Sequence, residues 1–158
     1  MTGPRFTFDR TWVFAASADD VWGLLTHTER YPRWWPWLAR LDSDGLTEGA
    51  VARCVVQPPL PYRLRFDVHL DRVDRPRLLE GTVTGDLQGP ARLELRPGDG
   101  SDTGPGRCTA RLAWEVELGS LRLRRIARVA RPVMQWGHDL VIDRGVQQFR
   151  RRALDRAP

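Results

Sequence analysis

His138 is the residue whose type and position best suit acid–base chemistry, because it lies in a stretch of helical periodicity from Leu121 to Leu154. At about 100° per residue, one stripe of this predicted helix carries apolar and small side chains, with His138 at its centre. The stripe consists of Leu123, Ala127, Ala130, Met134, His138, Val141, Gly145 and Phe149. An imidazole that faces a cavity could transfer a proton or bind a ligand carbonyl or phenol. An imidazole satisfied by a backbone carbonyl or a carboxylate in the core would occupy the same place, so a structural role stays open.

The side chains of this stripe project little from the helix, because three of its members are alanine or glycine, which makes the face thin. A helix that closes a cavity needs such a face, and so does a helix that packs closely on a sheet. If a cavity lies beneath the helix, Met134 and Val141 join His138 as candidate ligand contacts. Pro132 removes one backbone donor and predicts a kink or a restart of the helix at that point.

A cluster of aromatic residues lies between Tyr31 and Trp37, in the sequence YPRWWPW. Its two prolines limit it to a short helical turn or two. The rings could line or cover the mouth of a cavity and stack on a flat ligand, or they could plug short helices against the sheet. We take Trp34 and Trp35 as candidate ligand-binding residues. Adjacent rings point in different directions, so we expect at least one tryptophan ring, and not all three, in the cavity.

Two segments in the middle of the chain, 62–73 and 107–118, alternate between apolar and polar residues. This alternation predicts strands of an antiparallel sheet that has one face on a core and the other in water. On the apolar faces, Tyr62, Phe66 and Trp114 are candidate walls of a pocket. Packing in the core is an equally good interpretation of these three side chains.

The order of the predicted elements indicates an α+β protein. A strand at 5–14 precedes a short helix at 18–27 and the aromatic turns, and the other predicted strands cover 50–57, 62–73, 78–87, 91–96 and 107–118. We therefore predict one domain over residues 1–158. Its curved antiparallel sheet of six to seven strands wraps around the long C-terminal helix, with two short helices after the first strand. Such a sheet leaves a ligand pocket between itself and the helix.

Four further positions in the predicted strands have specific expectations. Gly81 and Gly85 either make room for a ligand or allow the helix to approach closely. Asp86 is the most interesting carboxylate, since it lies in a glycine-rich turn, although forming that turn is the role we expect. His69 falls on the polar face of its strand and is expected to be exposed to solvent.

The net charge of +5 and the pI near 10.4 raise the question of nucleic-acid binding. All 25 basic residues are arginine, and they are spread along the predicted strands and helix, so we do not expect a nucleic-acid partner. No motif for a cofactor or phosphate is present, and no metal site is expected. The apolar runs are too short for a transmembrane helix and no signal peptide is recognised, so we expect a cytoplasmic protein. Cys54 and Cys108 are expected to be buried free thiols.

Several segments resemble the SRPBCC superfamily, the START-related helix-grip proteins of the polyketide cyclase/dehydrase and lipid-transport type. They are residues 14–22 (FAASADDVW), 31–37 (YPRWWPW), 85–89 (GDLQG) and 130–139 (ARPVMQWGHD). The resemblance implies a seven-stranded sheet that grips the C-terminal helix, with an apolar ligand cavity between them. The superfamily has no shared catalytic motif that can be transferred to residues of this chain.

Together, these observations predict that an apolar small molecule binds between the sheet and the C-terminal helix. The molecule would be either lipid-like or of the polyketide or aromatic type. If the protein is an enzyme, the resemblance implies a reaction of the polyketide cyclase or dehydratase type. His138 would then move protons, and Tyr62 or a tryptophan N–H would donate to a carbonyl. A carrier without catalysis needs only volume and apolar walls. A third hypothesis is an interaction module that uses its arginine-rich surface to bind an acidic partner.

Overall fold

The structure is a computed structural model that describes residues 5–57, 62–98 and 106–151, without the side chains of residues 129–141. Seven strands and a long C-terminal helix make up most of it, with a short helix, a 3₁₀ turn and one further helical turn after the first strand. In chain order they are β1 (Arg5–Phe14), α1 (Ala18–Leu25), η1 (Thr28–Arg30), α2 (Tyr31–Trp34), β2 (Leu38–Ser43), β3 (Val51–Val56), β4 (Leu64–Asp74), β5 (Leu78–Gly85), β6 (Leu87–Pro97), β7 (Cys108–Leu118) and α3 (Leu121–Phe149).

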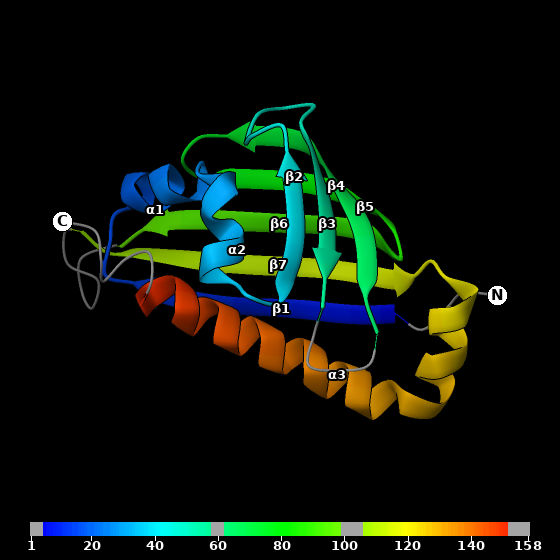
Figure 1. Ribbon diagram of the computed structural model, residues 1–158. Coiled ribbons are helices and arrows are strands. Elements are labelled where there is room, and N and C mark those ends of the chain that lie inside the picture. Colours follow the sequence, from blue (N-terminus) through cyan, green and yellow to red (C-terminus); the bar gives the residue numbers. More distant parts are fainter. Residues whose placement is uncertain (1–4, 58–61, 99–105, 152–158) are drawn as a thin grey trace.

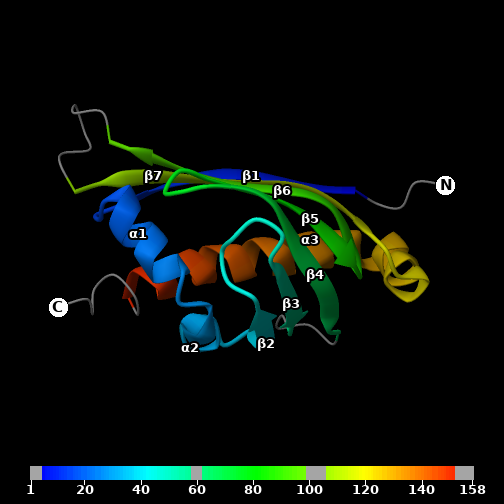
Figure 2. The same cartoon turned by 90° about the horizontal axis from the view of Figure 1, so that it is seen from above.

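The strands form one antiparallel sheet in the order β1-β7-β6-β5-β4-β3-β2. The sheet is strongly curved, so that β2 and β3 cross in front of β1, β7 and β6 (Figure 1). Seen from above, α3 lies between β2 and β3 on one side and β1, β7 and β6 on the other, and it closes the open side of the sheet (Figure 2). The α+β class, the helix-grip arrangement and the expected number of strands are therefore confirmed.

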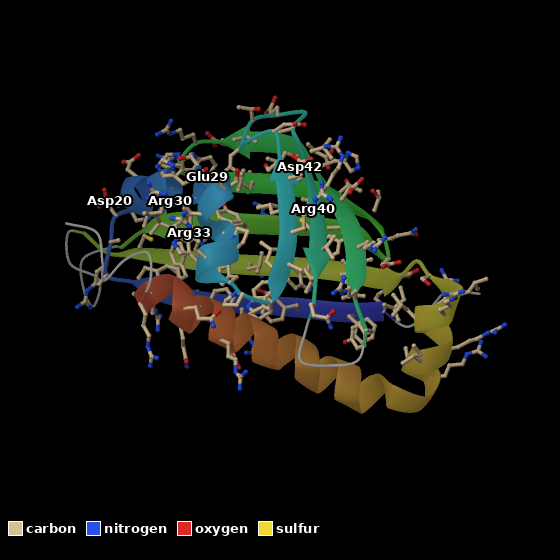
Figure 3. The ribbon with its side chains drawn as sticks, viewed as in Figure 1. Asp20, Glu29, Arg30, Arg33, Arg40 and Asp42 are labelled. Atoms are coloured by element: carbon tan, nitrogen blue, oxygen red, sulfur yellow. The ribbon has the colours of Figure 1, made fainter. Side chains whose placement is uncertain are left out.

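The alternation in the sequence correctly gives the two faces of the sheet. In β1, Phe6, Phe8 and Phe14 are buried on the concave side, whereas Thr7 and Asp9 are exposed. The charged side chains of the outer surface include Asp20, Glu29, Arg30, Arg33, Arg40 and Asp42, labelled in Figure 3. One apolar face is thus left for α3 to cover.

Two differences from the predicted strands have local causes. No strand was predicted at β2, because the sequence LARLDS has only two large apolar residues and lies at the sheet edge. The strand β6 begins at Leu87 rather than Ala91, since Gly89 and Pro90 read as turn residues but pair with β5. At Gly89 the backbone has φ +149°, and an added Cβ would lie 2.0 Å from the carbonyl oxygen of Glu115 on β7. Only glycine allows these two strands to come so close.

The helix α3 contacts the rest of the fold at both of its ends. Near its start, Leu123 and Ala127 are buried against Phe6, Val116 and Leu118 of β1 and β7; near its end, Phe149 packs in the aromatic cluster. The helix continues through Pro132 without a restart, but it changes direction after its first turns (Figure 1). A proline inside a helix produces such a bend because it cannot donate to the preceding turn.

Two predictions concern membrane-spanning helices and the end of the last helix. In the part of the chain that the structure describes, no helix is both long enough and apolar enough to cross a bilayer. The predicted extension of the last helix to Leu154 lies outside the described residues.

Candidate functional site

Below α3 the concave face of the sheet is hollow, and the larger hollow is called chamber 1. It has a volume of about 290 Å³. Side chains from β4, β5, β6 and β7 line it, together with Phe6 and Tyr62. The lining residues are Phe6, Tyr62, Leu64, Phe66, Val68, Leu70, Leu79, Gly81, Val83, Leu87, Ala91, Arg92, Leu93, Leu112, Trp114, Val116 and Leu118. Except for Arg92, which has the opposite parity on β6, the period of two along each strand places the strand residues on one side of the sheet, so the described walls are almost entirely apolar.

A second hollow, chamber 2, has a volume of about 240 Å³ and lies under the C-terminal end of α3. Its walls come from β1, α1, the aromatic segment and α3. They are Trp12, Phe14, Val21, Leu25, Trp35, Trp37, Leu93, Leu95, Ala110, Leu112, Trp114, Ile142, Gly145, Val146 and Phe149. Leu93, Leu112 and Trp114 belong to both lists. The two chambers therefore meet at these three side chains.

The end of α3 is fastened to the aromatic segment by Trp35. Its indole Nε1 donates to the carbonyl oxygen of Gly145 over 2.8 Å, and its ring stacks on Trp37 with centroids 6.0 Å apart. A Cβ at position 145 would lie 3.3 Å from Cζ2 of Trp37, so the glycine makes room for the indole rings. Gly145 therefore allows close packing of the helix on the indole rings and also forms part of the wall of chamber 2.

Trp34 and Tyr31 lie behind this wall. Trp34 is 5% exposed and packs edge-on against Trp35 and Phe149. The hydroxyl of Tyr31 donates to the carbonyl of Leu25, and burial raises the pKa of this phenol well above its ordinary range. Both residues therefore hold the short helices in place.

The polar groups of the described walls are few. Tyr62 lines chamber 1; its phenol is protonated at neutral pH and able to donate, and burial raises its pKa further. Trp37 contributes to chamber 2, but its Nε1 is buried and has no hydrogen-bond partner in the described part of the chain. Arg92 pairs with Glu80 and Glu94 instead of presenting a charge to the chamber.

The predicted site residues fall into three groups. Tyr62, Phe66 and Trp114 line chamber 1, and Trp35 lines chamber 2, whereas Trp34 is not among the residues lining either chamber. The other three predicted residues, Met134, His138 and Val141, lie outside the described side chains. Their roles in ligand binding, and that of His138 in catalysis, stay predictions.

Sequence reasoning did not single out several of the walls. Leu112 follows from the alternation that places Trp114, but its position between two chambers depends on how β7 pairs with β6. Phe149 was placed on the apolar stripe of the last helix without a role at the site, and Trp12 lies in the strand predicted at 5–14. Their place in the wall results from the curvature of the sheet, which no local pattern reports.

The strand glycines and Asp86 have structural roles. At Gly81 an added Cβ would lie 2.6 Å from the carbonyl oxygen of His69, so the glycine allows close approach of β4 rather than of the helix, and it also lines chamber 1. Gly85 has φ +116° and lies against Arg65 of β4 in the same way. Asp86 lies between β5 and β6, and its carboxylate accepts a 2.8 Å hydrogen bond from the backbone N–H of Arg65, which joins this connection to β4.

His69 and the cysteines complete the list of reactive groups. His69 lies on the outer face, as expected, but it is half-buried there, with Nε2 3.2 Å from Oγ1 of Thr84. Both cysteines are free; Cys108 is buried and Cys54 partly buried. Among the described residues, no group of three or more His, Cys, Asp or Glu side chains could hold a metal ion.

Comparison with known proteins agrees with this architecture. The model of the family described as "Polyketide cyclase / dehydrase and lipid transport" matches residues 5–157. The chain belongs to this family. No match was found among curated protein sequences.

Several solved structures of this family's fold are similar over nearly the whole chain. TTHA0849 from Thermus thermophilus has a TM-score of 0.71 at 13% identity, covering 98% of this chain and 100% of that one. The di-domain ARO/CYC BexL from the BE-7585A biosynthetic pathway has a TM-score of 0.70 at 17% identity, covering 98% of this chain and 51% of that one. Norcoclaurine synthase from Thalictrum flavum, in complex with dopamine and hydroxybenzaldehyde, has a TM-score of 0.64 at 15% identity, covering 99% and 91%. At these identities the likeness shows the fold alone, which is START-like.

Proposed function

We propose that this protein binds an apolar molecule with a flat, ring-containing body across the two chambers. The observation that carries the proposal is that chambers of about 290 and 240 Å³ meet at Leu93, Leu112 and Trp114. A ligand of this kind is recognised mainly by apolar burial, with a few polar groups that orient it.

The aromatic walls support a ring-containing ligand over a simple acyl chain. Phe66 and Trp114 stand in chamber 1, and Trp12 and Trp35 in chamber 2. Aromatic pairs gain energy beyond their buried area when the rings are offset or edge-on, which an acyl chain cannot match. The phenol of Tyr62 would donate to an oxygen of the ligand at the end of chamber 1.

Two interpretations of this binding differ in chemistry. A carrier needs no more than the chambers. A cyclase or dehydratase of the polyketide type also needs a group that accepts a proton at neutral pH. Tyr62 is a donor there and no base, because a phenol is protonated at neutral pH and burial raises its pKa further. Proton abstraction would therefore fall to His138, whose place on the apolar stripe of α3 is a sequence prediction.

The first experiment is mass spectrometry of gently purified protein, under native conditions and after organic extraction. A stoichiometric ring-containing molecule in the native complex supports the proposal, and its structure separates the lipid from the polyketide class. If the extract holds only acyl lipids, the preference for rings is wrong.

Binding should then be measured with an uncharged aromatic probe, N-phenyl-1-naphthylamine, by its fluorescence. Val68→Phe fills part of chamber 1 and should weaken binding by at least about tenfold, because the ring displaces ligand from apolar walls. Val13→Phe is the matched control, since Val13 is 46% exposed on the other side of the sheet. Equal affinities for the two variants would show that the probe binds elsewhere.

The enzyme and the carrier separate at His138→Ala. A carrier should keep its affinity for the extracted molecule within a few-fold. An enzyme should lose turnover of the molecule's precursor while it still binds it. Tyr62→Phe tests the orienting hydrogen bond, and should weaken binding of oxygen-bearing ligands more than that of hydrocarbons.

A further inference from the structure

The outer side of the first two turns of α3 carries positive charge that the fold does not use. Arg122, Arg125 and Arg128 are exposed, and within the described residues their guanidinium groups have no ion-pair or hydrogen-bond partner. Some arginines on the outer face of the sheet do have ion-pair partners. Arg5 and Arg111, for example, pair with Glu117 and Asp9 on neighbouring strands.

Large apolar side chains lie among these arginines. Leu121 is 72% exposed and Ile126 is 44% exposed, and they are two of the three large hydrophobic side chains found exposed in the described residues. On a helix, Leu121 is followed on one line by Arg125 and Arg128, and Arg122 is followed on the next by Ile126. These five residues, Leu121, Arg122, Arg125, Ile126 and Arg128, form one continuous area that we call the basic–apolar surface.

The basic–apolar surface lies directly over one end of chamber 1. The opposite side of the same two turns carries Leu123 and Ala127, which are buried against Phe6, Val116 and Leu118. Those three side chains also line chamber 1. This end of the molecule lies away from α1 and α2 (Figures 1 and 2).

We propose that the basic–apolar surface docks on an anionic lipid bilayer. Arginines near such a membrane are attracted by its surface potential, and aliphatic side chains beside them enter the boundary between headgroups and acyl chains. The arginine stems lie along the apolar region while the guanidinium groups reach the phosphates. Nucleic acid would satisfy the charges but leave Leu121 and Ile126 in water. A bilayer satisfies both kinds of group.

Docking in this orientation would bring chamber 1 next to the bilayer. An apolar ligand could then pass between membrane and chamber without crossing water. This consequence rests on the proposed function, but docking itself does not. If vesicle binding fails while N-phenyl-1-naphthylamine still binds, only the docking proposal is wrong.

The electrostatic part is tested by co-sedimentation of the full chain with vesicles of phosphatidylcholine and phosphatidylglycerol, compared with pure phosphatidylcholine. Binding should require the anionic lipid and fall as salt is raised. The triple variant Arg122→Gln, Arg125→Gln, Arg128→Gln should bind roughly 100-fold more weakly, since each arginine near the surface contributes about fivefold. The control triple Arg40→Gln, Arg72→Gln, Arg77→Gln removes as much charge from exposed positions elsewhere and should change binding less than about threefold. Equal losses in the two triples, or no preference for anionic lipid, would overturn the proposal.

The apolar part is tested by Ile126→Gln against Val13→Gln. The two side chains have nearly the same exposure, 44% and 46%, so both variants should keep the fold. Ile126→Gln should weaken vesicle binding by about tenfold and Val13→Gln should not. Leu121→Gln provides a second variant in the basic–apolar surface. If neither Ile126→Gln nor Leu121→Gln weakens vesicle binding, the bilayer proposal is wrong. It is also wrong if the wild-type protein binds an acidic polymer such as polyglutamate as tightly as it binds the vesicles. Either result would indicate an acidic protein partner.

Discussion

Trp35→Phe should loosen the attachment of α3 to the aromatic segment while leaving an aromatic ring in place. In the native protein the indole Nε1 of Trp35 donates to the carbonyl oxygen of Gly145 over 2.8 Å. The ring also lies among Tyr31, Trp37 and Phe149, with centroids 4.9, 6.0 and 6.1 Å away. Phenylalanine keeps most of these ring contacts but has no donor.

The expected loss follows from two terms. A hydrogen bond of this kind contributes about 0.5–1.5 kcal/mol to the free energy of unfolding. The smaller ring buries less apolar area, which costs about 1 kcal/mol more. Trp35→Phe should therefore lower the free energy of unfolding by about 2 kcal/mol. For a chain of this size, that loss corresponds to a decrease in Tm of roughly 4–8 °C.

Trp37→Phe is the matched control, because it makes the same chemical change in the adjacent, stacked indole. The Nε1 of Trp37 is buried without a hydrogen-bond partner in the described residues, so its removal breaks no hydrogen bond. Removing a buried unpaired donor relieves a penalty of about 1–3 kcal/mol, which offsets the loss of ring area. The net change should be less than about 1 kcal/mol.

The assay is urea unfolding followed by far-UV circular dichroism, since tryptophan fluorescence is itself altered by both substitutions. Equal m-values would show that the variants unfold from comparably compact states. If Trp37→Phe is as destabilising as Trp35→Phe, the hydrogen bond to Gly145 does not hold α3, and the reasoning is wrong.

Three further results are expected. Gly23→Ala in α1 should raise the free energy of unfolding by about 1 kcal/mol, because an added Cβ meets nothing within 4 Å. Gly145→Ala should show no such gain, because its Cβ would lie 3.3 Å from Trp37. Equal gains of the two variants in thermal unfolding would contradict this reasoning. The hydrogen bond from Arg111 holds the pKa of Asp9 below its ordinary value, so Asp9 stabilises the fold above its unfolded pKa and loses this effect as the pH falls through its folded pKa. The Tm of the wild-type protein should thus fall more than that of Asp9→Asn between about pH 6 and about pH 2, and parallel curves would refute the pairing. Burial raises the pKa of Cys54 to about 12 and also raises the pKa of Cys108, so both thiols should react slowly with Ellman's reagent until urea is added; rapid labelling of the native protein would show that they are accessible.

Much of the fold follows from local patterns, as β4 and β7 illustrate. Their alternation places Phe66 and Trp114 on the apolar face, and the structure agrees. The failures are equally local in origin. The edge strand β2 has too few apolar residues to be recognised, and Gly89 and Pro90 resemble a turn although they pair within β6.

The candidate site was predictable only where a wall belongs to such a strand. Trp35 and Trp34 are neighbours in the chain and equally aromatic, yet only Trp35 lines a chamber. Which ring faces inwards depends on the position of α2 relative to α3, which local sequence does not contain. The area around Leu121 and Ile126 was also not predicted as a surface, because helical periodicity alone does not say which arginines find partners.

The sequence by itself determined the class of the fold, the two faces of the sheet and the helix that covers one of them. These are short-range properties, because the direction of the side chains repeats every 2 residues in a strand and every 3.6 residues in a helix. The pocket was predicted, but tertiary structure alone decided which side chains line it and that Leu93, Leu112 and Trp114 stand where two chambers meet. That arrangement requires the curvature of the sheet and the pairing of β6 with β7, which join residues far apart in the chain.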